Sequence, residues 1–418
     1  MREKEHLGIR LTNTVNKKRF IDHLFSAQAE SELQKYSQGK GLLFSDLAIA
    51  TIHEEERRYD KSLIGTRKLA SHSSGERKKL FIEYILQQNP DFIILDNPLD
   101  HLDQASRATF KKQLQDISQE KTLIQLANRA SDFLPFITHK FDLDEDIFTL
   151  NPISASPKEN LSAQKQLNLP KNGQNTANND HELLKMEQVC VSYDGRPIVK
   201  DISWTIRPGD FWQLVGPNGS GKSTLLALIT GESTKGYGQD LYLFGHKKGS
   251  GESIWEIKQK IGYFAPNMTE LFQRNNTLLE MVLSGFFDSI GLYDRPTTLQ
   301  QKQAIAWLQL ANLQVDKNIN FNKLSPGQQR LGLILRAVVK NPPLLILDEP
   351  TEGLDDTGAQ LVIDLVNTLK DQTEMAIIFV SHRVEKGLRP QSIFELVPTE
   401  NGSTGKIILK NQLKSVKN

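Results

Sequence analysis

Two short apolar runs, each closed by an aspartate, stand at widely separated places in the chain. Residues 92–95 read Phe-Ile-Ile-Leu before Asp96, and residues 344–347 read Leu-Leu-Ile-Leu before Asp348. A run of this length, bounded by polar residues and proline, is typical of a parallel strand that is buried on both faces. The pattern therefore predicts two α/β sheets, each with an aspartate at the strand end where such sheets bind ligands.

Apolar residues at helical spacing precede both predicted strands. After Gly75 they are Leu80, Phe81, Tyr84 and Ile85, and after Gly327 they are Leu331, Leu333, Ile334, Ala337 and Val338. Spacings of three and four predict amphipathic helices. Each helix follows a Ser-x-Gly sequence, beginning at Ser73 or Ser325, and serine commonly caps a helix. Each serine taken alone is best interpreted as a cap, but its repetition in both halves argues for a further role.

These landmarks repeat with equal spacing. Gly75 precedes Asp96 by 21 residues (96 − 75), and Gly327 precedes Asp348 by the same 21 (348 − 327). The other repeated pairs are Leu102-Asp103 with Leu354-Asp355, and residues 123–129 with residues 377–383. Several landmarks in one order indicate that the chain is an internal duplication.

A stretch rich in Asn, Gln, Ser and Pro separates the two halves. Over residues 151–181 its few apolar side chains cannot bury enough surface to offset the entropy of ordering, so we expect a flexible linker. The predicted organisation is a first domain over residues 1–150, the linker over 151–181, and a second domain over 182–418.

The strongest chemical motif is a glycine-rich loop between a predicted strand, residues 211–215, and an apolar helical run, residues 225–229. The loop consists of Gly216, Pro217, Asn218, Gly219, Ser220, Gly221, Lys222, Ser223 and Thr224. Glycines let backbone N–H groups converge on one point, and the following helix adds positive potential, so this context predicts a nucleotide-phosphate site. Lys222 suits the β- and γ-phosphates, and the Ser223 hydroxyl suits Mg²⁺.

The second half also holds the groups that hydrolysis requires. Asp348 can hold Mg²⁺ through water, and Glu349 beside it can align or deprotonate the attacking water. His382, after the predicted strand 377–380, can contact the γ-phosphate. A lone histidine is more often structural, but its place after a phosphate loop and an Asp-Glu pair favours catalysis.

With these motifs in this order, residues 183–410 resemble an ATP-binding-cassette (ABC) ATPase domain. The resemblance implies a P-loop α/β fold and ATP hydrolysis, with Tyr193 stacking on adenine. In that family the signature Ser and Gly bind the γ-phosphate of a nucleotide held on the opposite domain, which implies a head-to-tail sandwich of two cassettes. The two fused cassettes, the first signature and residues 283–293 resemble a tandem-cassette branch associated with molybdate transport.

The first half departs from the family pattern. It has Asn97 where Glu349 stands and Asn128 where His382 stands, so we expect its own nucleotide site to be inactive. In the second half 109 residues separate Gly216 from Ser325 (325 − 216), and the same spacing would place the first loop before Met1. The first cassette is therefore expected to be incomplete. Apolar residues near its start, namely Phe20, Leu24, Phe25 and Leu33, are interpreted as remnants of a helical subdomain that cannot hold a complete core.

What the first half keeps is its signature, Ser73, Gly75 and Glu76. We expect these residues to complete one composite ATP site on the second half, which leaves Ser325 and Gly327 facing an empty position. The alternative is a homodimer of second cassettes, in which Ser325 of one copy serves Lys222 of the other.

A further departure follows the predicted strand at residues 261–264. Pro266 stands where the family usually has a glutamine that touches Mg²⁺ and relays to a membrane partner. Proline cannot coordinate the metal, so coupling to a permease is in question. Asn267 is the neighbouring residue that can replace the glutamine.

Composition narrows the function classes. The 51 Lys and Arg against 50 Asp and Glu give a net charge of +1, so the basic footprint of a nucleic-acid binder is missing. The single cysteine, Cys190, cannot form an internal disulfide, and no apolar run approaches the ~20 residues of a membrane span. We expect a cytoplasmic ATP-binding transporter subunit, peripheral to the inner face of the membrane when a permease binds it. The alternative is a soluble regulatory or ribosome-associated ATPase of the translation-factor branch.

Overall fold

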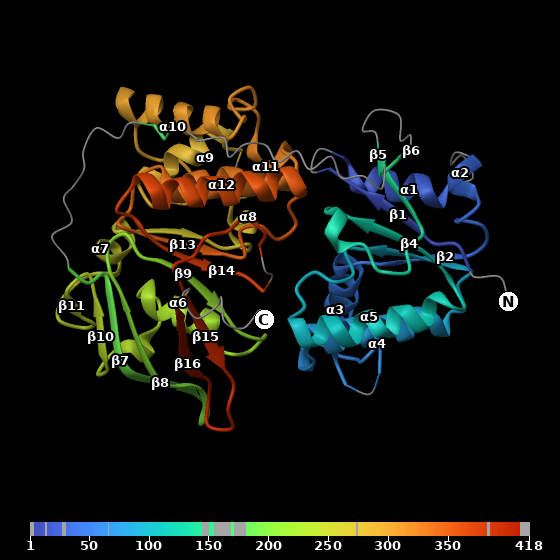
Figure 1. Ribbon diagram of the computed structural model, residues 1–418, viewed down its shortest axis with the longest axis horizontal. Helices are drawn as coiled ribbons and strands as arrows, with labels where there is room; N and C mark the ends of the chain where they lie inside the picture. Colours follow the sequence, from blue (N-terminus) through green and yellow to red (C-terminus); the bar gives the residue numbers. More distant parts are fainter. Residues whose placement is uncertain are drawn as a thin grey trace. The chain divides into compact units, whose positions relative to one another are not determined.

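The computed structural model describes residues 4–12, 15–26, 31–65, 67–143, 150–153, 169–170, 181–272, 275–382 and 385–409. The chain divides into two compact units (Figure 1). One consists of Met1–Asn160 and Gly353–Thr357, and the other of Leu161–Glu352 and Gly358–Asn418. Most of the predicted linker, residues 154–168 and 171–180, lies outside the described residues, so the boundaries at 151 and 181 stay a prediction.

The second unit is built on a six-stranded sheet. In sheet order its strands are β12 (Ile261–Phe264), β13 (Leu344–Asp348), β14 (Ala376–Val380), β9 (Phe211–Val215), β15 (Ser392–Val397) and β16 (Thr404–Leu409). The first five are parallel, and β16 is antiparallel to β15. The four apolar residues of β13 are all buried, as the sequence predicts for a strand covered on both faces.

A smaller antiparallel sheet covers one side of this unit. Its strands are β11 (His246–Lys247), β10 (Asp240–Leu243), β7 (Leu184–Tyr193) and β8 (Arg196–Ile206). Helix α6 (Lys222–Ile229) lies between the two sheets in Figure 1, and its leucines join a core cluster with residues of both. The helix after the phosphate loop is therefore held on two sides.

The other helices of the second unit include the predicted signature helix. They are α7 (Ile254–Gln259), α8 (Met268–Leu271), α9 (Leu278–Leu283), α10 (Thr298–Leu310), α11 (Pro326–Val338) and α12 (Asp356–Gln372). α11 packs closely on the segment after α9, because a Cβ atom at Gly285 would lie 2.2 Å from the carbonyl oxygen of Arg336. Arg336 is buried there and donates to the Ser284 hydroxyl at 3.0 Å.

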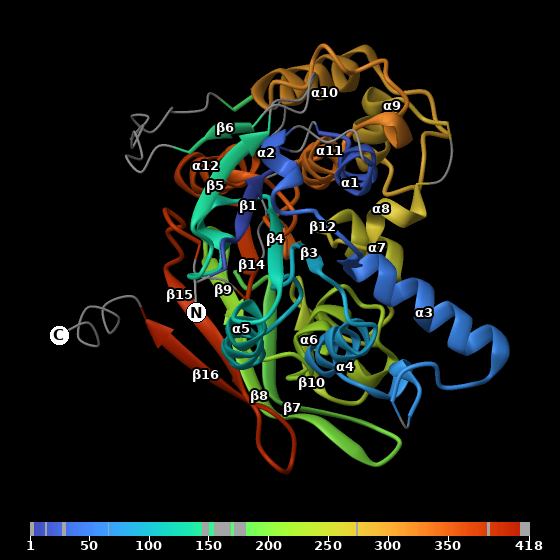
Figure 2. The same cartoon turned by 90° about the vertical axis from the view of Figure 1, so that its right-hand side faces the viewer.

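The first unit also has a six-stranded sheet. In sheet order its strands are β2 (Gly41–Phe44), β3 (Phe92–Asp96), β4 (Thr122–Ala127), β1 (Leu7–Arg10), β5 (His139–Leu143) and β6 (Leu150–Pro152). Its helices are α1 (Lys17–Phe25), α2 (Ser31–Gln34), α3 (Asp46–Tyr59), α4 (Ser74–Gln87) and α5 (Gln104–Ser118). Figures 1 and 2 show α4 and α5 together on one face of the sheet, and Figure 1 shows α1 on the other.

Both faces of this sheet are covered by apolar side chains. On the α4 and α5 side, Phe81 and Phe110 pack against Ile93 and Leu95 of β3. On the α1 side, the cluster contains Phe20, Leu24, Leu33, Phe92 and Ile94. The expectation that Phe20, Leu24 and Leu33 are remnants without a complete core is therefore wrong, because each is at most 1% exposed in a core of the sheet. Phe25 is 44% exposed.

The two parallel sheets match strand for strand. β2, β3, β4, β1, β5 and β6 take the positions of β12, β13, β14, β9, β15 and β16, and the last pair is antiparallel in both. The register agrees as well, since Ile9 pairs with Leu126 as Leu214 pairs with Val380. β1 therefore holds the place of β9, the strand that leads into the phosphate loop.

This equivalence corrects the expectation that the first loop falls before Met1. Lys17 follows Arg10, the end of β1, by seven residues (17 − 10), as Lys222 follows Val215 (222 − 215). Equal spacing fails because both intervening stretches are shorter in the first half: Phe44 follows Lys17 by 27 residues (44 − 17) against 42 (264 − 222) in the second, and Ser73 follows Phe44 by 29 (73 − 44) against 61 (325 − 264). Between Arg10 and Lys17 the sequence reads Leu-Thr-Asn-Thr-Val-Asn and contains no glycine, whereas the stretch between Val215 and Lys222 contains Gly216, Gly219 and Gly221. The described part of the first unit also holds no counterpart of the antiparallel sheet.

Candidate nucleotide site

The phosphate loop joins β9 to α6 in the second unit. Two of its glycines adopt backbone angles that other residues rarely adopt, with φ of 77° at Gly219 and 94° at Gly221. A Cβ atom at Gly221 would lie 2.6 Å from Cγ1 of Val199, so a side chain at this position clashes. The amine of Lys222 donates to the carbonyl oxygen of Gly216 at 2.8 Å, which folds the side chain back along the loop.

A buried hydroxyl in this loop has no hydrogen-bond partner among the described residues. It is Oγ of Ser220, a residue that is 1% exposed. Buried polar atoms are normally bonded, and a phosphate oxygen is the acceptor that this motif predicts. Gly221, the N-cap of α6, brings no side chain to the first turn, where the helix dipole is positive. The loop therefore fits the phosphates of a nucleotide.

Asp348, Glu349 and His382 lie together at the carboxyl ends of β13 and β14, which pair as parallel neighbours. Nε2 of His382 lies 3.1 Å from Oε1 of Glu349, and the backbone N–H of His382 donates to Oε2 at 3.4 Å. The two side chains are 15% and 13% exposed. Because β14 also pairs with β9, the phosphate loop begins at the same edge of the sheet. The structure thus brings the sequence-predicted Lys222, Asp348, Glu349 and His382 to one edge of one unit.

Burial shifts the acid–base properties of both carboxyl groups. It raises the pKa of Glu349 to about 8, and the charges of Glu352 and Asp348 act in the same direction. It also raises the pKa of Asp348 to about 6, with Lys222 opposing the shift and Glu352 adding to it. Glu352, which is 9% exposed, was not predicted as a site residue. Its place three residues after Glu349 could have indicated that a third carboxylate lies near Asp348 and Glu349. A carboxyl group that titrates near neutral pH suits a general base.

The raised pKa of Glu349 predicts how stability depends on pH. From the ordinary value of 4.5 up to about 8 the folded protein keeps a proton that the unfolded chain releases, so this group favours folding less as pH rises through that window. Glu349→Gln is neutral throughout. In metal-free and nucleotide-free protein we expect the variant to be more stable than the natural protein by about 1–3 kcal/mol at pH 8.5, with the gain vanishing near pH 5. Denaturant unfolding at both pH values measures this, and a gain independent of pH would contradict it.

Comparison with known proteins identifies the family. The sequence family described as ABC transporter matches residues 199–352. The ABC transporter ATP-binding protein ModF of Escherichia coli is 40% identical over 331 residues, which cover 75% of this chain and 67% of ModF. The chain belongs to the ABC transporter ATP-binding family. Proteins of this family are P-loop ATPases, which confirms the predicted α/β fold class and enzyme class.

Further relatives carry the same description. An uncharacterised ABC transporter ATP-binding protein of Schizosaccharomyces pombe is 31% identical over 324 residues, 75% of this chain and 65% of that protein. Among solved structures, CbiO1 from Clostridium perfringens, part of the ABC transporter complex CbiONQ, aligns with a TM-score of 0.49 and 22% identity, over 57% of this chain and 92% of CbiO1. The chain spans about two thirds of the length of the curated relatives that it matches.

Both ABC signatures begin a helix. Ser73 caps α4 and Ser325 caps α11, and in each case the side chain three residues on, Glu76 or Gln328, accepts from the backbone N–H of the serine. Each serine is thus a helix cap, and the further role that its repetition favours stays a prediction. The hydrogen bond from Ser73 also lowers the pKa of Glu76. Gly75 and Gly327 lie in the first turns of these helices, and both are buried.

The first unit keeps a lysine and an aspartate at the positions of Lys222 and Asp348 but has asparagines at those of Glu349 and His382, and these side chains bond to one another. Nζ of Lys17 lies 2.8 Å from Oδ1 of Asp96, the position equivalent to Asp348. The Asn97 side chain donates to Oδ1 of Asn128 at 3.3 Å and accepts from the Asn128 backbone N–H at 3.2 Å. This amide pair repeats the geometry of Glu349 and His382 without a group that can take a proton.

Two family positions at the edge of the site are also described. Tyr193, at the end of β7, is 42% exposed, and Nζ of Lys235 lies 5.5 Å from the centre of its ring. Asn267 precedes α8 without a side-chain capping bond, and Pro266 stands before it. The side chains of Ser223 and Thr224 belong to the first turn of α6.

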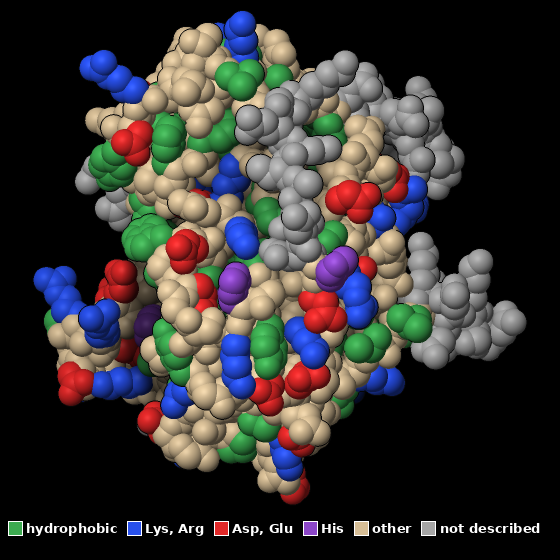
Figure 3. Space-filling view, turned by 90° about the vertical axis from the view of Figure 1, so that its left-hand side faces the viewer, with side chains coloured by type: hydrophobic (Ala, Val, Ile, Leu, Met, Phe, Trp, Pro, Cys, Tyr) green, Lys and Arg blue, Asp and Glu red, His purple; other side chains and the backbone are tan. Residues whose placement is uncertain are grey.

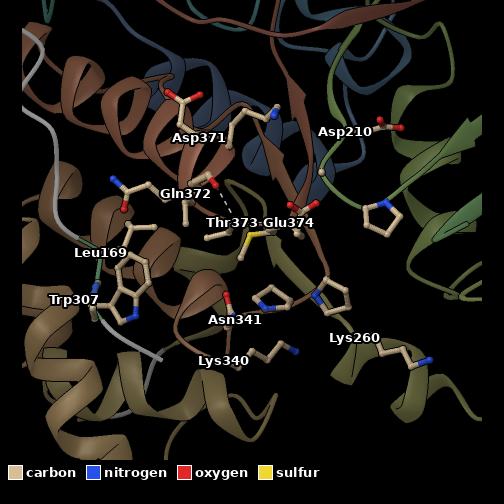
Figure 4. A pocket seen from close by; sticks show the side chains of 18 of the residues that line it. Leu169, Asp210, Lys260, Trp307, Lys340, Asn341, Asp371, Gln372, Thr373 and Glu374 are labelled. Atoms are coloured by element: carbon tan, nitrogen blue, oxygen red, sulfur yellow. Dashed lines mark hydrogen bonds between the residues drawn. The ribbon is translucent and has the colours of Figure 1, made fainter. Parts of the chain in front are cut away.

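A cavity of about 1500 Å³ lies at the opposite edge of the same sheet (Figure 4). Asp210, Lys260 and Met375, which precede β9, β12 and β14, line it, so it opens at the amino ends of the strands. Leu169 and Pro170, the described residues in the middle of the predicted linker, also line it. Since open α/β sheets bind nucleotides at the carboxyl ends, this cavity is separate from the phosphate loop.

The surface carries no basic stripe on the face shown in Figure 3, where Lys and Arg alternate with Asp and Glu over the described residues. This matches the balanced composition of the chain. Among the helices of the described part, none is both long and apolar enough to cross a membrane.

Proposed function

We propose that the protein is an ATP-hydrolysing ABC subunit with one competent ATP site, carried by the second unit. The observation that supports this is a contrast between equivalent positions. The second unit has a glycine loop, Lys222 and a largely buried Glu349–His382 pair, whereas the first has no glycine between Arg10 and Lys17, and its Lys17 pairs with Asp96. This contrast supports the proposal that the first unit does not hydrolyse ATP at a site of its own.

In this proposal each residue of the second unit has a defined role. Tyr193 stacks on adenine, the backbone of the loop from Gly216 to Thr224 cradles the phosphates, and Lys222 neutralises them. Ser223, and Asp348 through water, would hold Mg²⁺, which would offset the charge of the phosphates when bound. Glu349 orients the attacking water and takes its proton, and His382 contacts the γ-phosphate. Water oxygen then bonds to the γ-phosphorus as the bond to the ADP oxygen breaks.

The residues Ser73, Gly75 and Glu76 are proposed to complete this site when the halves close on ATP. The support is their retention in a unit that has lost its own loop glycines, glutamate and histidine. The start of α4, capped by Ser73 and with Gly75 buried, presents backbone N–H donors at the positive end of the helix, which suits a γ-phosphate.

Separate replacement of the two signature serines tests this assignment. If Ser73 completes the competent ATP site of the second unit, Ser73→Ala lowers ATP turnover by about ten-fold or more, whereas Ser325→Ala leaves turnover within two-fold of the natural protein. Both serines cap equivalent helices, so each variant controls for the structural cost in the other. Steady-state phosphate release measures the difference. Loss of turnover only in Ser325→Ala would instead support the homodimer of second cassettes.

We further propose that the ATPase drives a membrane permease, as an ATP-binding subunit of the molybdate-associated type. The support is the 40% identity with ModF and the description of the relatives as transporter ATP-binding proteins. Those relatives do not favour the ribosome-associated alternative. Pro266 and Asn267 in place of the usual glutamine imply that coupling to the permease uses a different side chain, for which Asn267 is the candidate.

A further inference from the structure

The two segments that carry Glu349 and His382 leave the sheet as neighbours. Glu349 follows β13, and His382 follows β14. At the sheet, the backbone N–H of Glu349 donates to the carbonyl oxygen of Val380 at 3.1 Å. Beyond the sheet, the backbone contact from His382 to the Glu349 carboxylate is long, at 3.4 Å. The separation of the two side chains therefore depends on what else ties these segments together.

A buried hydrogen bond supplies such a tie. Thr351, two residues after Glu349, donates its hydroxyl to a carboxylate oxygen of Glu385, three residues after His382. The two residues are 2% and 8% exposed. A carboxylate at this depth is costly unless it is bonded, so this hydrogen bond helps to hold Thr351 and Glu385 together.

The turn that Thr351 anchors is a strained one. Glu349 has a φ of 50°, in the left-handed region that side chains other than Gly and Asn rarely adopt. Such a conformation persists when its surroundings hold it in place. The backbone N–H of Glu352 donates to the Glu349 carbonyl oxygen at 3.2 Å across the turn, and the Thr351 hydroxyl fixes the turn from the other side.

The duplication supplies an internal comparison. In the first unit, where asparagines replace the catalytic pair, Leu99 stands at the position of Thr351 and Ser131 at the position of Glu385. Leu99 is 4% exposed, so it fills the same buried place without a hydroxyl. Asn97 keeps the left-handed φ, 43°, which asparagine adopts more readily than glutamate. The hydroxyl–carboxylate bond is thus present in the unit with the catalytic pair and replaced in the unit without it.

We propose that Thr351 and Glu385 are positioning residues that fix the Glu349 carboxylate against His382 and so set the rate of ATP cleavage. The inference rests on the proposed function of the second unit. The bond reaches neither the phosphate loop nor Tyr193, so its loss acts on turnover and leaves nucleotide affinity unchanged. Misplacement of a catalytic group by less than 1 Å is enough to slow a reaction by about ten-fold or more.

Hydroxyl deletion with rescue tests this proposal. Thr351→Val keeps the shape and removes the donor, and we expect kcat to fall about ten-fold with KM for MgATP unchanged, while Thr351→Ser restores kcat to within about two-fold of the natural protein. Thr368→Val is the matched control, because Thr368 is also buried and its hydroxyl donates to the Asp364 carbonyl oxygen within α12. The control should lower the melting temperature without lowering kcat.

A double variant separates a shared bond from two independent effects. If Thr351 and Glu385 act through one hydrogen bond, Thr351→Val combined with Glu385→Met, which removes the acceptor, lowers kcat no further than the more impaired of the two single variants. An unchanged kcat in Thr351→Val, or equal loss in Thr351→Val and Thr368→Val, would overturn the proposal. Failure of the proposed function is distinct, because the natural protein itself would then lack Lys222-dependent ATP cleavage.

Discussion

Replacing Lys222 by alanine is expected to reduce ATP turnover by at least about 100-fold. The lysine is 9% exposed and folds over the phosphate loop, so its loss removes the buried positive charge that the β- and γ-phosphates require. We also expect MgATP affinity to fall, because the charge acts on bound nucleotide as well as on the transition state. Phosphate release and equilibrium binding of a fluorescent ATP analogue measure the two effects.

The duplication provides the control for this result. Lys17 occupies the position in the first unit that Lys222 occupies in the second, but it pairs with Asp96 at 2.8 Å. Lys17→Ala should leave turnover and affinity within two-fold and lower stability by no more than about 1 kcal/mol, as expected for a partly exposed ion pair. Retained turnover in Lys222→Ala, or equal losses in both variants, would refute a single competent site.

Glu349→Gln is expected to lower turnover by about 100-fold or more while ATP still binds. Glutamine keeps the size of the side chain but cannot take a proton from water, and general-base catalysis contributes about 10²–10⁴ in rate. Because Lys222 and the loop are unchanged, the variant should hold MgATP without cleaving it. Single-turnover cleavage and retention of radiolabelled ATP on gel filtration measure this outcome.

The matched variant in the first unit is Asn97→Gln, which changes an equivalent residue that lacks a proton-accepting group. It should turn over ATP at the natural rate. Full turnover in Glu349→Gln would remove Glu349 from the role of base, and a loss in Asn97→Gln would show that the first unit takes part in cleavage.

Much of the second unit follows from sequence, because its features are local. Apolar runs such as residues 344–347 predict strands, and the glycine loop is a contiguous motif that needs no long-range information. The equivalence of β1 to β9 could not be predicted from the sequence, because no glycine follows β1 before Lys17. It appears only in the strand pairing, in which Ile9 of β1 pairs with Leu126 of β4. The prediction that the first loop lies before Met1 was wrong for a different reason. The lengths of the connections between strands differ in the two halves, and such differences change the spacing along the chain without changing the order of the strands in the sheet.

Effects that depend on burial or on pairing between distant segments could not be predicted from the sequence. The cluster of Glu352 with Asp348 and Glu349 is visible in the sequence, but the rise in the pKa of Glu349 comes mainly from burial, which the sequence does not give. The bond between Thr351 and Glu385 joins segments that are 34 residues apart in the chain. Burial and pairing across the sheet decide such effects, and neither is written in a local pattern.

The ion pair between Lys17 and Asp96 also bears on how stability follows nucleotide supply. Lys17 already has a counter-charge within its own unit, so the proposed gain from MgATP, which grows with the logarithm of its free concentration, originates at the loop of the second half. In this proposal the first half shares in that gain only through its signature residues, Ser73 to Glu76.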